Sequence, residues 1–256
     1  MEKTKKSNKA ANIVYAALPA IILIVLIIAI WEGVCVANNI PTWQLPKPSD
    51  IGSALVAGAK DTAPYLLSTY VNILVGFVLA VVIGIAFALL ISNVPVLADA
   101  LTPLVMILCC VPMVTLVPLL LVSMGTGPGP KILTIIIQCF PIVNMNACVG
   151  FANADPSRVE LMQSMKATKF ELYRYCIFPD ALPTIFTGIK LSSVLAMISG
   201  VAAELCGGEG GLGNHISYLL GVNRTPEALA NLLYVMILGL VLYGVITLLE
   251  KKLVKR

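Results

Sequence analysis

Long runs of apolar residues alternate with short polar segments along the whole chain. Residues 13–37 carry a single charged residue, Glu32, and residues 62–98 carry none. Roughly 20 apolar residues in a helix cross a hydrocarbon core of about 30 Å, so each run is long enough to span a membrane. Helix breakers such as the Gly- and Pro-rich stretch 125–130 divide the runs. The pattern predicts six membrane-spanning helices, near residues 13–37, 66–92, 101–124, 132–152, 182–205 and 228–249.

Basic residues gather on one predicted side of the membrane. Under the positive-inside rule, the short loops richest in Lys and Arg face the cytosol. Twelve of the 17 basic residues precede the first span, separate the fourth from the fifth, or follow the sixth: Lys3, Lys5, Lys6, Lys9, Arg158, Lys166, Lys169, Arg174, Lys251, Lys252, Lys255 and Arg256. We therefore expect both termini in the cytosol, which requires an even number of spans. Residues 1–12 are then a basic cytosolic segment, and residues 13–256 a single transmembrane domain. The first apolar run is longer than the apolar region of a signal peptide, about 7–15 residues, so it is expected to be a retained helix.

The composition excludes several other classes of protein. Hydrophobic residues make up 59% of the chain and charged residues 12%, whereas soluble domains have about 45–50% and about 25%. A soluble core cannot hide this much apolar surface. The seven cysteines form no CxxC or Cys/His spacing that would indicate a disulfide framework or a metal site, and a net charge of +4 gives no sign of nucleic-acid binding. We expect an all-α, polytopic membrane protein.

One polar loop, residues 153–180, is long enough for structure of its own. Asp155 followed by Pro156 is typical of a helix N-terminus. Thr168, with a glutamate three residues later, indicates a capping box, so a second short helix is expected to begin there and to end before Pro179. Both helices combine apolar and basic side chains. They suit docking into the groove of a cytosolic partner or, equally, lying on the lipid surface, and the sequence leaves both open.

The same loop resembles the EAA motif of ABC importer permeases. In words, that motif is Glu-Ala-Ala, three residues, Gly, nine residues, and Ile-x-Leu-Pro. Its positions recur here with every interval intact: Glu160 as the Glu, Lys166 as the Gly, Cys176 as the Ile and Phe178-Pro179 as the Leu-Pro. Flanking stretches agree with the nitrate/sulfonate/taurine branch of that family: residues 45–50, 178–183 and 211–213. The resemblance covers the chain from about residue 39 to its end.

The resemblance implies a permease subunit that forms half of a translocation pore. Such subunits usually pair as a homodimer in the bacterial cytoplasmic membrane, bind two cytosolic ATPase subunits and receive solute from an extracytoplasmic binding protein. ATP and Mg²⁺ belong to the ATPase, so this chain is expected to be no enzyme and to hold no cofactor or metal. The loop residues that would transmit the motion of the ATPase are Glu160, Met162, Lys166, Ala167, Thr168, Phe170 and Pro179.

Lys166 departs from the motif, whose glycine lies at the turn between two coupling helices. If this turn needs a positive φ, a lysine there costs roughly 1–2 kcal/mol. Otherwise the turn has shifted, and Lys166 points its charge at the partner. The sequence does not decide between these two alternatives.

Polar side chains inside the predicted spans are candidates for the translocation path or, alternatively, for hydrogen bonds that hold helices together. They are Asn144, Asn146, Ser192, Ser199 and Glu204. Glu204 either lies at the outer mouth of the path or hydrogen-bonds the glycine-rich stretch that comes after it. Lys190 is expected to extend its long side chain back to the cytosolic surface. Four glycines are expected to allow close helix contacts: Gly76, Gly84, Gly188 and Gly200.

The segment after the fifth span contains a glycine-rich motif and the single histidine. Residues 208–213 match the GxGxxG dinucleotide fingerprint in letters but come after a membrane helix, so a flexible extracellular turn is expected instead. The histidine, His215, is expected to be an exposed loop residue, while a contact with the binding protein or a gating role stays open.

The residues of the spans do not identify the substrate. The branch resemblance implies a small anion such as a sulfonate, taurine or nitrate, with a thiamine- or pyrimidine-type vitamin precursor as the alternative. A secondary transporter without an ATPase is the alternative class, although it usually has inverted repeats and more polar residues within the membrane. A channel would not need the 153–180 loop, and no convergent set of catalytic residues indicates an intramembrane enzyme.

Overall fold

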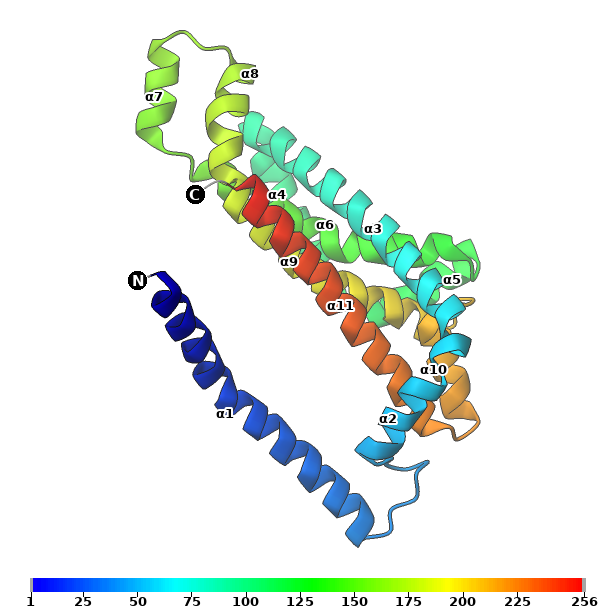
Figure 1. Cartoon of the computed structure of the whole chain (residues 1–256). Coiled ribbons are helices and arrows are strands. Elements are labelled where there is room, and N and C mark those ends of the chain that lie inside the picture. Colours follow the sequence, from blue (N-terminus) through cyan, green and yellow to red (C-terminus); the bar gives the residue numbers. More distant parts are fainter. Residues whose placement is uncertain (1, 255–256) are drawn as a thin grey trace. The chain divides into compact units, whose positions relative to one another are not determined.

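Every regular element in the described part of the chain is helical (Figure 1). The computed structural model describes residues 2–254 and the side chains of residues 18–254 other than Pro95 and Asp99. The helices in chain order are α1 (Glu2–Ala37), α2 (Pro48–Ala57), α3 (Ala59–Asn93), α4 (Pro95–Cys109), α5 (Met113–Met124), α6 (Pro128–Ala152), α7 (Pro156–Ser164), α8 (Lys169–Leu172), the π-helical turn η1 (Tyr173–Ile177), α9 (Phe178–Leu205), α10 (Gly211–Gly221) and α11 (Thr225–Leu253). The expected all-α class is confirmed. The side chains of the predicted basic segment 1–12, and Lys255 and Arg256, lie outside the described residues.

The chain divides into two units, the first formed by residues 1–60 and 219–230 and the second by residues 61–218 and 231–256. In the first unit, Glu32 of α1 holds the start of α2. The backbone N–H of Ser49 and its hydroxyl group donate hydrogen bonds of 3.1 and 2.7 Å to the Glu32 carboxylate. A carboxylate at a helix N-terminus is favourable because unpaired N–H groups point toward it.

Five helical segments in the described residues are long and apolar enough to cross a membrane: Leu18–Ala37, Ala59–Asn93, Pro128–Ala152, Lys169–Leu205 and Thr225–Leu253. A sixth span is reached if α4 and α5 count together, but these two helices meet at an angle of 94°. The expectation of one continuous helix over residues 101–124 is therefore wrong. Pro112 causes the break, because it has no N–H to donate and disfavours the helical conformation at Val111.

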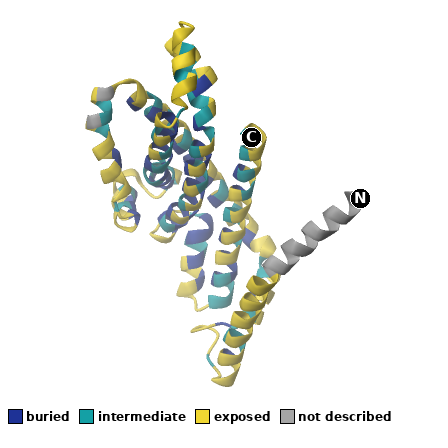
Figure 2. Ribbon diagram, turned by 90° about the vertical axis from the view of Figure 1, so that its left-hand side faces the viewer, coloured by how far each residue is buried: buried dark blue, intermediate teal, exposed yellow. Residues whose placement is uncertain are grey.

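The second unit is built around the packing of α6 against α9, with α3 and α11 beside them, and the buried residues, dark blue in Figure 2, gather in this bundle of helices. Its core consists of interlocking apolar side chains, among them Ile73, Phe77, Ile135, Cys139, Phe186, Met197 and Leu242. Small residues bring the helices together. A β-carbon added at Gly76 or Gly84 would lie 2.9 Å from the Cβ of Ile135 or Val143, and one added at Gly188 or Gly200 would lie 2.6 Å from Asn146 or Ile73. The predicted close contacts at all four glycines are confirmed.

The second helix of the 153–180 loop does not end before Pro179. It continues from α8 through η1 into α9, and the N–H of Phe178 bonds to the carbonyl oxygen of Tyr173, five residues back. A π-turn of this kind widens the helix and helps it accommodate a proline, whose ring would otherwise meet the carbonyl four residues earlier. The outcome is a single helical path from Lys169 to Leu205.

The glycine-rich stretch after α9 is also more ordered than expected. Gly207, Gly210 and Gly211 have φ values of +113°, +69° and +86°, so the chain does turn there, but α10 begins at Gly211. The apolar spacing of α10 was overlooked. Leu212, Ile216 and Leu219 recur at helical intervals, and all three are buried.

Candidate functional site

The first half of the 153–180 loop is a short helix that packs on few neighbours. Asp155 caps α7 as predicted, since its carboxylate accepts a 3.0 Å hydrogen bond from the N–H of Ser157. No residue of α7 is buried. The apolar side chain of Leu161 is 62% exposed, and that of Met165, directly after the helix, is 74% exposed. Exposed apolar side chains on a helix outside the spans indicate a surface made for a partner.

The turn after α7 resolves the question of Lys166, which has φ +54°. The N–H of Lys166 donates to the carbonyl oxygen of Gln163 (2.9 Å), and the N–H of Ala167 donates to that of Met162 (3.0 Å). These two bonds form a Schellman motif with Lys166 at the left-handed position that glycine usually occupies. Of the two alternatives, the positive φ therefore applies, and the turn lies at Lys166.

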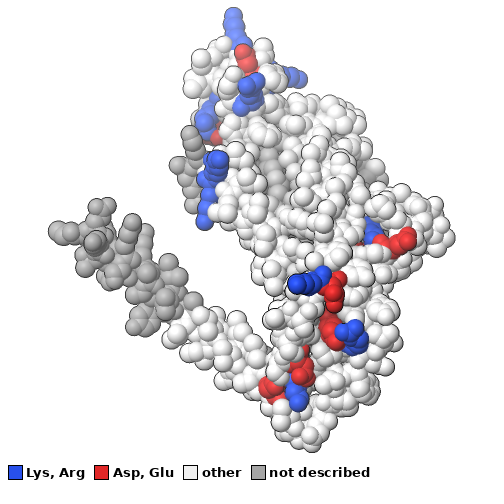
Figure 3. Space-filling view, turned by 45° about the vertical axis from the view of Figure 1, so that its right-hand side comes forward, with Lys and Arg blue, Asp and Glu red and all other residues white. Residues whose placement is uncertain are grey.

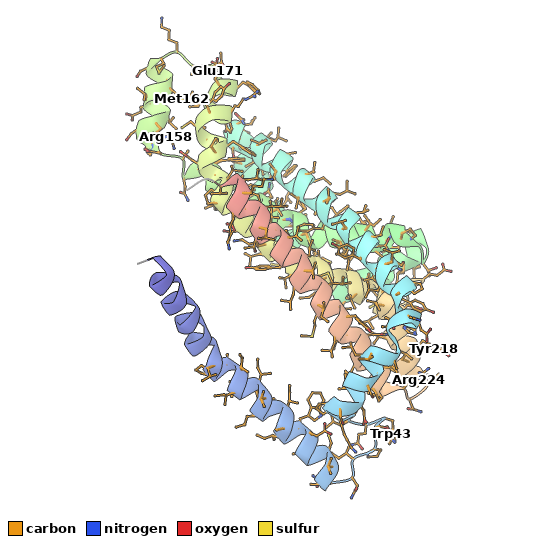
Figure 4. The ribbon with its side chains drawn as sticks, in the orientation of Figure 1. Trp43, Arg158, Met162, Glu171, Tyr218 and Arg224 are labelled. Carbon is orange, nitrogen blue, oxygen red and sulfur yellow. The ribbon has the colours of Figure 1, made fainter. Side chains whose placement is uncertain are left out.

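The second half of the loop begins with the predicted capping box. The N–H and hydroxyl groups of Thr168 donate to the Glu171 carboxylate at 2.7 and 2.8 Å, and the N–H of Glu171 donates back to the Thr168 hydroxyl oxygen. Phe170 comes directly after the first residue of α8 and is 71% exposed. Figure 4 shows Arg158 and Met162 on α7 and Glu171 on α8, at opposite sides of the turn.

Two contacts join the loop firmly to the long helix behind it. Arg158 of α7 forms an ion pair with Asp180 in the first turn of α9. The ring of Phe151, at the end of α6, lies 6.0 Å from the ring of Tyr173 and 6.2 Å from that of Phe178. Basic side chains gather at this end of the second unit and a wide band without charge separates them from the other end (Figure 3).

Of the loop residues expected to meet a partner, most are exposed and two are half-buried. The exposed residues are Glu160, Lys166, Thr168, Phe170 and Pro179, and the half-buried residues are Met162 and Ala167. Pro179 lies apart from the others, further along the continuing helix, as the second residue of α9.

A buried ion pair lies near the far end of α9. The ammonium group of Lys131 and the carboxylate of Glu204 are 3.7 Å apart, and the two side chains are only 2% and 1% exposed. The Lys131 ammonium also donates to the carbonyl oxygens of Glu209 (2.5 Å) and Gly210 (3.2 Å). A buried charge of this kind is tolerated only where partners replace its hydration.

The Glu204 carboxylate is bound from the other side as well. It accepts hydrogen bonds from the Thr69 hydroxyl group (2.8 Å) and from the N–H of Gly213 (3.0 Å), and the Thr69 oxygen accepts one from the N–H of Leu212 (2.7 Å). A side chain at Gly211 would strike the carboxylate itself. The predicted hydrogen bonding of Glu204 to the glycine-rich stretch is confirmed, whereas Thr69 and Lys131 were missed.

The chain shares its sequence pattern with a family of transport proteins. The family model described as "Binding-protein-dependent transport system inner membrane component" matches residues 80–255. The chain belongs to this family. The matched range contains the permease's entire 153–180 loop and both residues of the buried ion pair.

Curated relatives span nearly the full length of the permease. The nitrate import permease protein NrtB of Synechocystis sp. is 27% identical over 244 residues, which are 92% of this chain and 88% of that protein. The riboflavin transport system permease protein RibX of Chloroflexus aurantiacus is 28% identical (94% and 91%), and the taurine transport system permease protein TauC of Escherichia coli 26% identical (89% and 85%). The permease therefore lies in the branch that includes nitrate and taurine permeases.

A solved structure of the MetNI methionine ABC transporter, in an inward-facing conformation, has the same fold. It matches the permease with a TM-score of 0.60 and 20% identity, over 78% of this chain and 96% of that one.

The polar residues predicted for the translocation path lie mostly inside the permease's own helix packing. Asn144, Ser192, Ser199 and Glu204 are buried, and Asn146 is half-buried. Asn144 donates to the carbonyl oxygen of Gly84 (3.2 Å) on a neighbouring helix. Ser192, Asn146 and Ser199 hydrogen-bond within their own helices. The Ser192 hydroxyl group donates to the carbonyl oxygen of Ile189 (3.0 Å), and the side chains of Asn146 and Ser199 donate to carbonyl oxygens four positions back.

The structure bears on two other expectations about single residues of the permease, of which the one for His215 is wrong. His215 lies in α10, where its ring stacks on Tyr65 at 4.3 Å and its Nδ1 lies 2.8 Å from the Asn231 amide nitrogen, so it is not an exposed loop residue. Lys190 reaches the end of α11 that precedes Lys251 and Lys252, with 20% of its side chain exposed, which is consistent with the expected extension toward that surface. Its ammonium group forms a 2.9 Å ion pair there with Glu250 of α11, a partner that the sequence did not indicate.

Proposed function

We propose that the permease forms half of an ATP-driven import pore, as a homodimer with two cytosolic ATPase subunits and an extracytoplasmic binding protein. The observation that carries this proposal is the 153–180 loop, a helical surface of exposed apolar and basic side chains with no buried residue in α7. ATP and Mg²⁺ bind the ATPase, and this chain contributes no catalytic group.

The loop suits the transmission of motion. Its turn is fixed by the Schellman motif, its second helix by the capping box, and its first helix by the Arg158–Asp180 pair. The contact residues on it are Glu160, Met162, Lys166, Ala167, Thr168 and Phe170, with Pro179 behind them. Because the helical path runs unbroken from Lys169 to Leu205, a displacement of the loop reaches the buried pair at Glu204.

The proposed cycle is alternating access. ATP binding closes the ATPase dimer and pushes the loop, the helices from α4 to α9 rearrange, and the cavity opens outward to receive solute from the binding protein. Hydrolysis returns the pore to the inward-facing state. Both termini lie in the cytosol, on the side where the loop and most basic residues are, and the membrane is the bacterial cytoplasmic membrane.

The substrate proposed first is a small anion of the nitrate, sulfonate or taurine type, on the strength of the nitrate and taurine relatives. A vitamin or vitamin precursor is the second candidate, because the riboflavin relative is as similar to this chain. Asn144, Asn146, Ser192, Ser199 and Glu204 remain the candidates for the path, of which Asn146 is the most accessible.

Co-purification tests this proposal. The tagged permease, expressed with its genomic neighbours and isolated in detergent, is expected to recover an ATPase in equal stoichiometry. Glu160→Lys should abolish this recovery, while Glu227→Lys, the same charge reversal on α11, should not. A folded chain that purifies alone and transports without ATP would instead be a secondary transporter.

A further inference from the structure

A cleft of about 420 Å³ lies between the end of α3 and the helix that continues the 153–180 loop. Its α3 wall contains Leu89 and Asn93, where the long apolar run of α3 stops. Its other wall contains the aromatic rings of Phe170, Tyr173 and Phe178. The volume is that of a small-molecule site, and the position marks the boundary between the apolar core of the membrane and its polar surface.

Two cations border this cleft. Lys169 and Arg174 both line it, and both are exposed. Among the described residues, neither forms an ion pair, whereas Lys131, Arg158 and Lys190 each pair with a carboxylate. The Arg174 guanidinium lies 6.0 Å from the centre of the Phe170 ring in the cleft wall and 5.7 Å from that of Tyr175, outside the cleft, so aromatic rings flank it.

An apolar, aromatic cleft bordered by two uncompensated cations is complementary to an amphiphilic anion. We propose that this cleft binds one anionic phospholipid of the adjoining leaflet, with its phosphate at Lys169 and Arg174 and the start of an acyl chain against Leu89 and Tyr173. Basic pockets beside membrane helices on the cytoplasmic side bind anionic headgroups in this way. The assignment of the leaflet rests on the orientation given in the proposed function.

The proposal divides the loop into two faces with different partners, and the two faces meet at Phe170, which is 71% exposed and also lines the cleft. Glu160, Met162 and Lys166, on α7 and the turn, belong to the protein-docking face, whereas Lys169 and Arg174 line the cleft beside α3. A bound lipid would brace the start of the long helix against α3. Both possibilities that the sequence left open for this loop then apply, each to a different side of it.

Native mass spectrometry of the full-length chain in detergent tests the proposal. The chain is titrated with phosphatidylglycerol and with phosphatidylcholine of the same acyl chains, and the affinity for the first bound lipid is compared. Each cation near an anionic surface strengthens binding, so Lys169→Gln/Arg174→Gln is expected to weaken the first phosphatidylglycerol about 30-fold and to leave phosphatidylcholine unchanged. Lys251→Gln/Lys252→Gln removes the same charge from the exposed end of α11 and should bind as the wild type does.

Equal phosphatidylglycerol affinity in the wild type and the Lys169/Arg174 variant would overturn the proposal, as would equal losses in both double variants. Displacement of the lipid by millimolar inorganic phosphate would also overturn the proposal, because it would show a site for small anions in general and not for a phospholipid. If the double variant unfolds, the single variant Lys169→Gln should still weaken binding about fivefold. ATPase recovery is measured in the same preparations. If the wild-type chain recovers no ATPase but still prefers phosphatidylglycerol, only the proposed function is refuted. The Lys169/Arg174 variant is expected to recover the ATPase and to lose the preference for phosphatidylglycerol.

Discussion

Lys166 shows how a single residue can keep a conformation that its chemistry disfavours. Three described residues other than glycine have a positive φ, namely Asn39, Lys166 and Asn223. Asparagine tolerates the left-handed region because its short side chain bonds locally, whereas lysine pays the full steric cost of its β-carbon. The two hydrogen bonds of the Schellman motif hold Lys166 there. Lys166 thus adopts, in place of the motif glycine, a backbone conformation that glycine usually occupies.

Lys166→Gly should therefore stabilise the turn. Removing the β-carbon relieves roughly 1–2 kcal/mol of strain, and the greater freedom of glycine in the open turn offsets part of it, which leaves a net gain of about 1 kcal/mol. Amide hydrogen exchange at residues 166 and 167 should slow about fivefold. Lys166→Ala removes the charge but keeps the β-carbon, so it should leave exchange unchanged. A similar slowing in both variants would attribute the effect to charge.

Lys131 and Glu204 provide a second prediction at this scale. Either Lys131→Met or Glu204→Gln leaves the other group buried with fewer partners, so each should lower the free energy of unfolding by about 3–5 kcal/mol. The double variant should lose less than the sum of the two, because no unpaired charge remains. Denaturant titration of the purified chain measures all three. Strictly additive losses would mean that the two groups, 3.7 Å apart, are energetically independent.

At the scale of elements, apolar run length located five of the six spans, because a helix must satisfy its own backbone in lipid. Local capping rules located both helices of the loop. The rest depends on contacts between distant residues. The 94° bend at Pro112 and the helix that starts at Gly211 were missed, since a proline or glycine allows a break but fixes neither its angle nor the structure of the next segment.

Helix packing gives a prediction for α6 and α9. A β-carbon at Gly188 would lie 2.6 Å from the Cβ of Asn146, so Gly188→Ala should force the helices apart and lower stability by about 1–3 kcal/mol. Gly244→Ala is the matched control in α11, where nothing lies within 4 Å of the added carbon. There the higher helix propensity of alanine should raise stability by about 0.5–1 kcal/mol. Thermal unfolding compares the two, and a loss at both positions would contradict the packing argument.

At the scale of the molecule, the long helix from Lys169 to Leu205 connects the loop at one end of the second unit with the buried cluster at the other. The sequence predicted the loop residues from a spacing that is local, and most of them lie at the surface. It identified Glu204 but not Thr69 or Lys131, which are 135 and 73 positions away in the chain and meet it only through the packing of α3, α6 and α9. In the proposed homodimer the translocation path involves a second subunit, so the path residues named from the sequence stay predictions.

Coupling to an ATPase through the 153–180 loop is the property on which the proposed function of this permease depends. The most direct test is uptake, in whole cells, of the radiolabelled ligand of the co-purified binding protein. Glu160→Lys should insert in the membrane at the wild-type level yet reduce uptake more than about tenfold, because a reversed charge at a docked surface costs several kcal/mol. Glu227→Lys should transport normally. Normal uptake by Glu160→Lys, at the same amount of inserted protein, would contradict the coupling role of the loop.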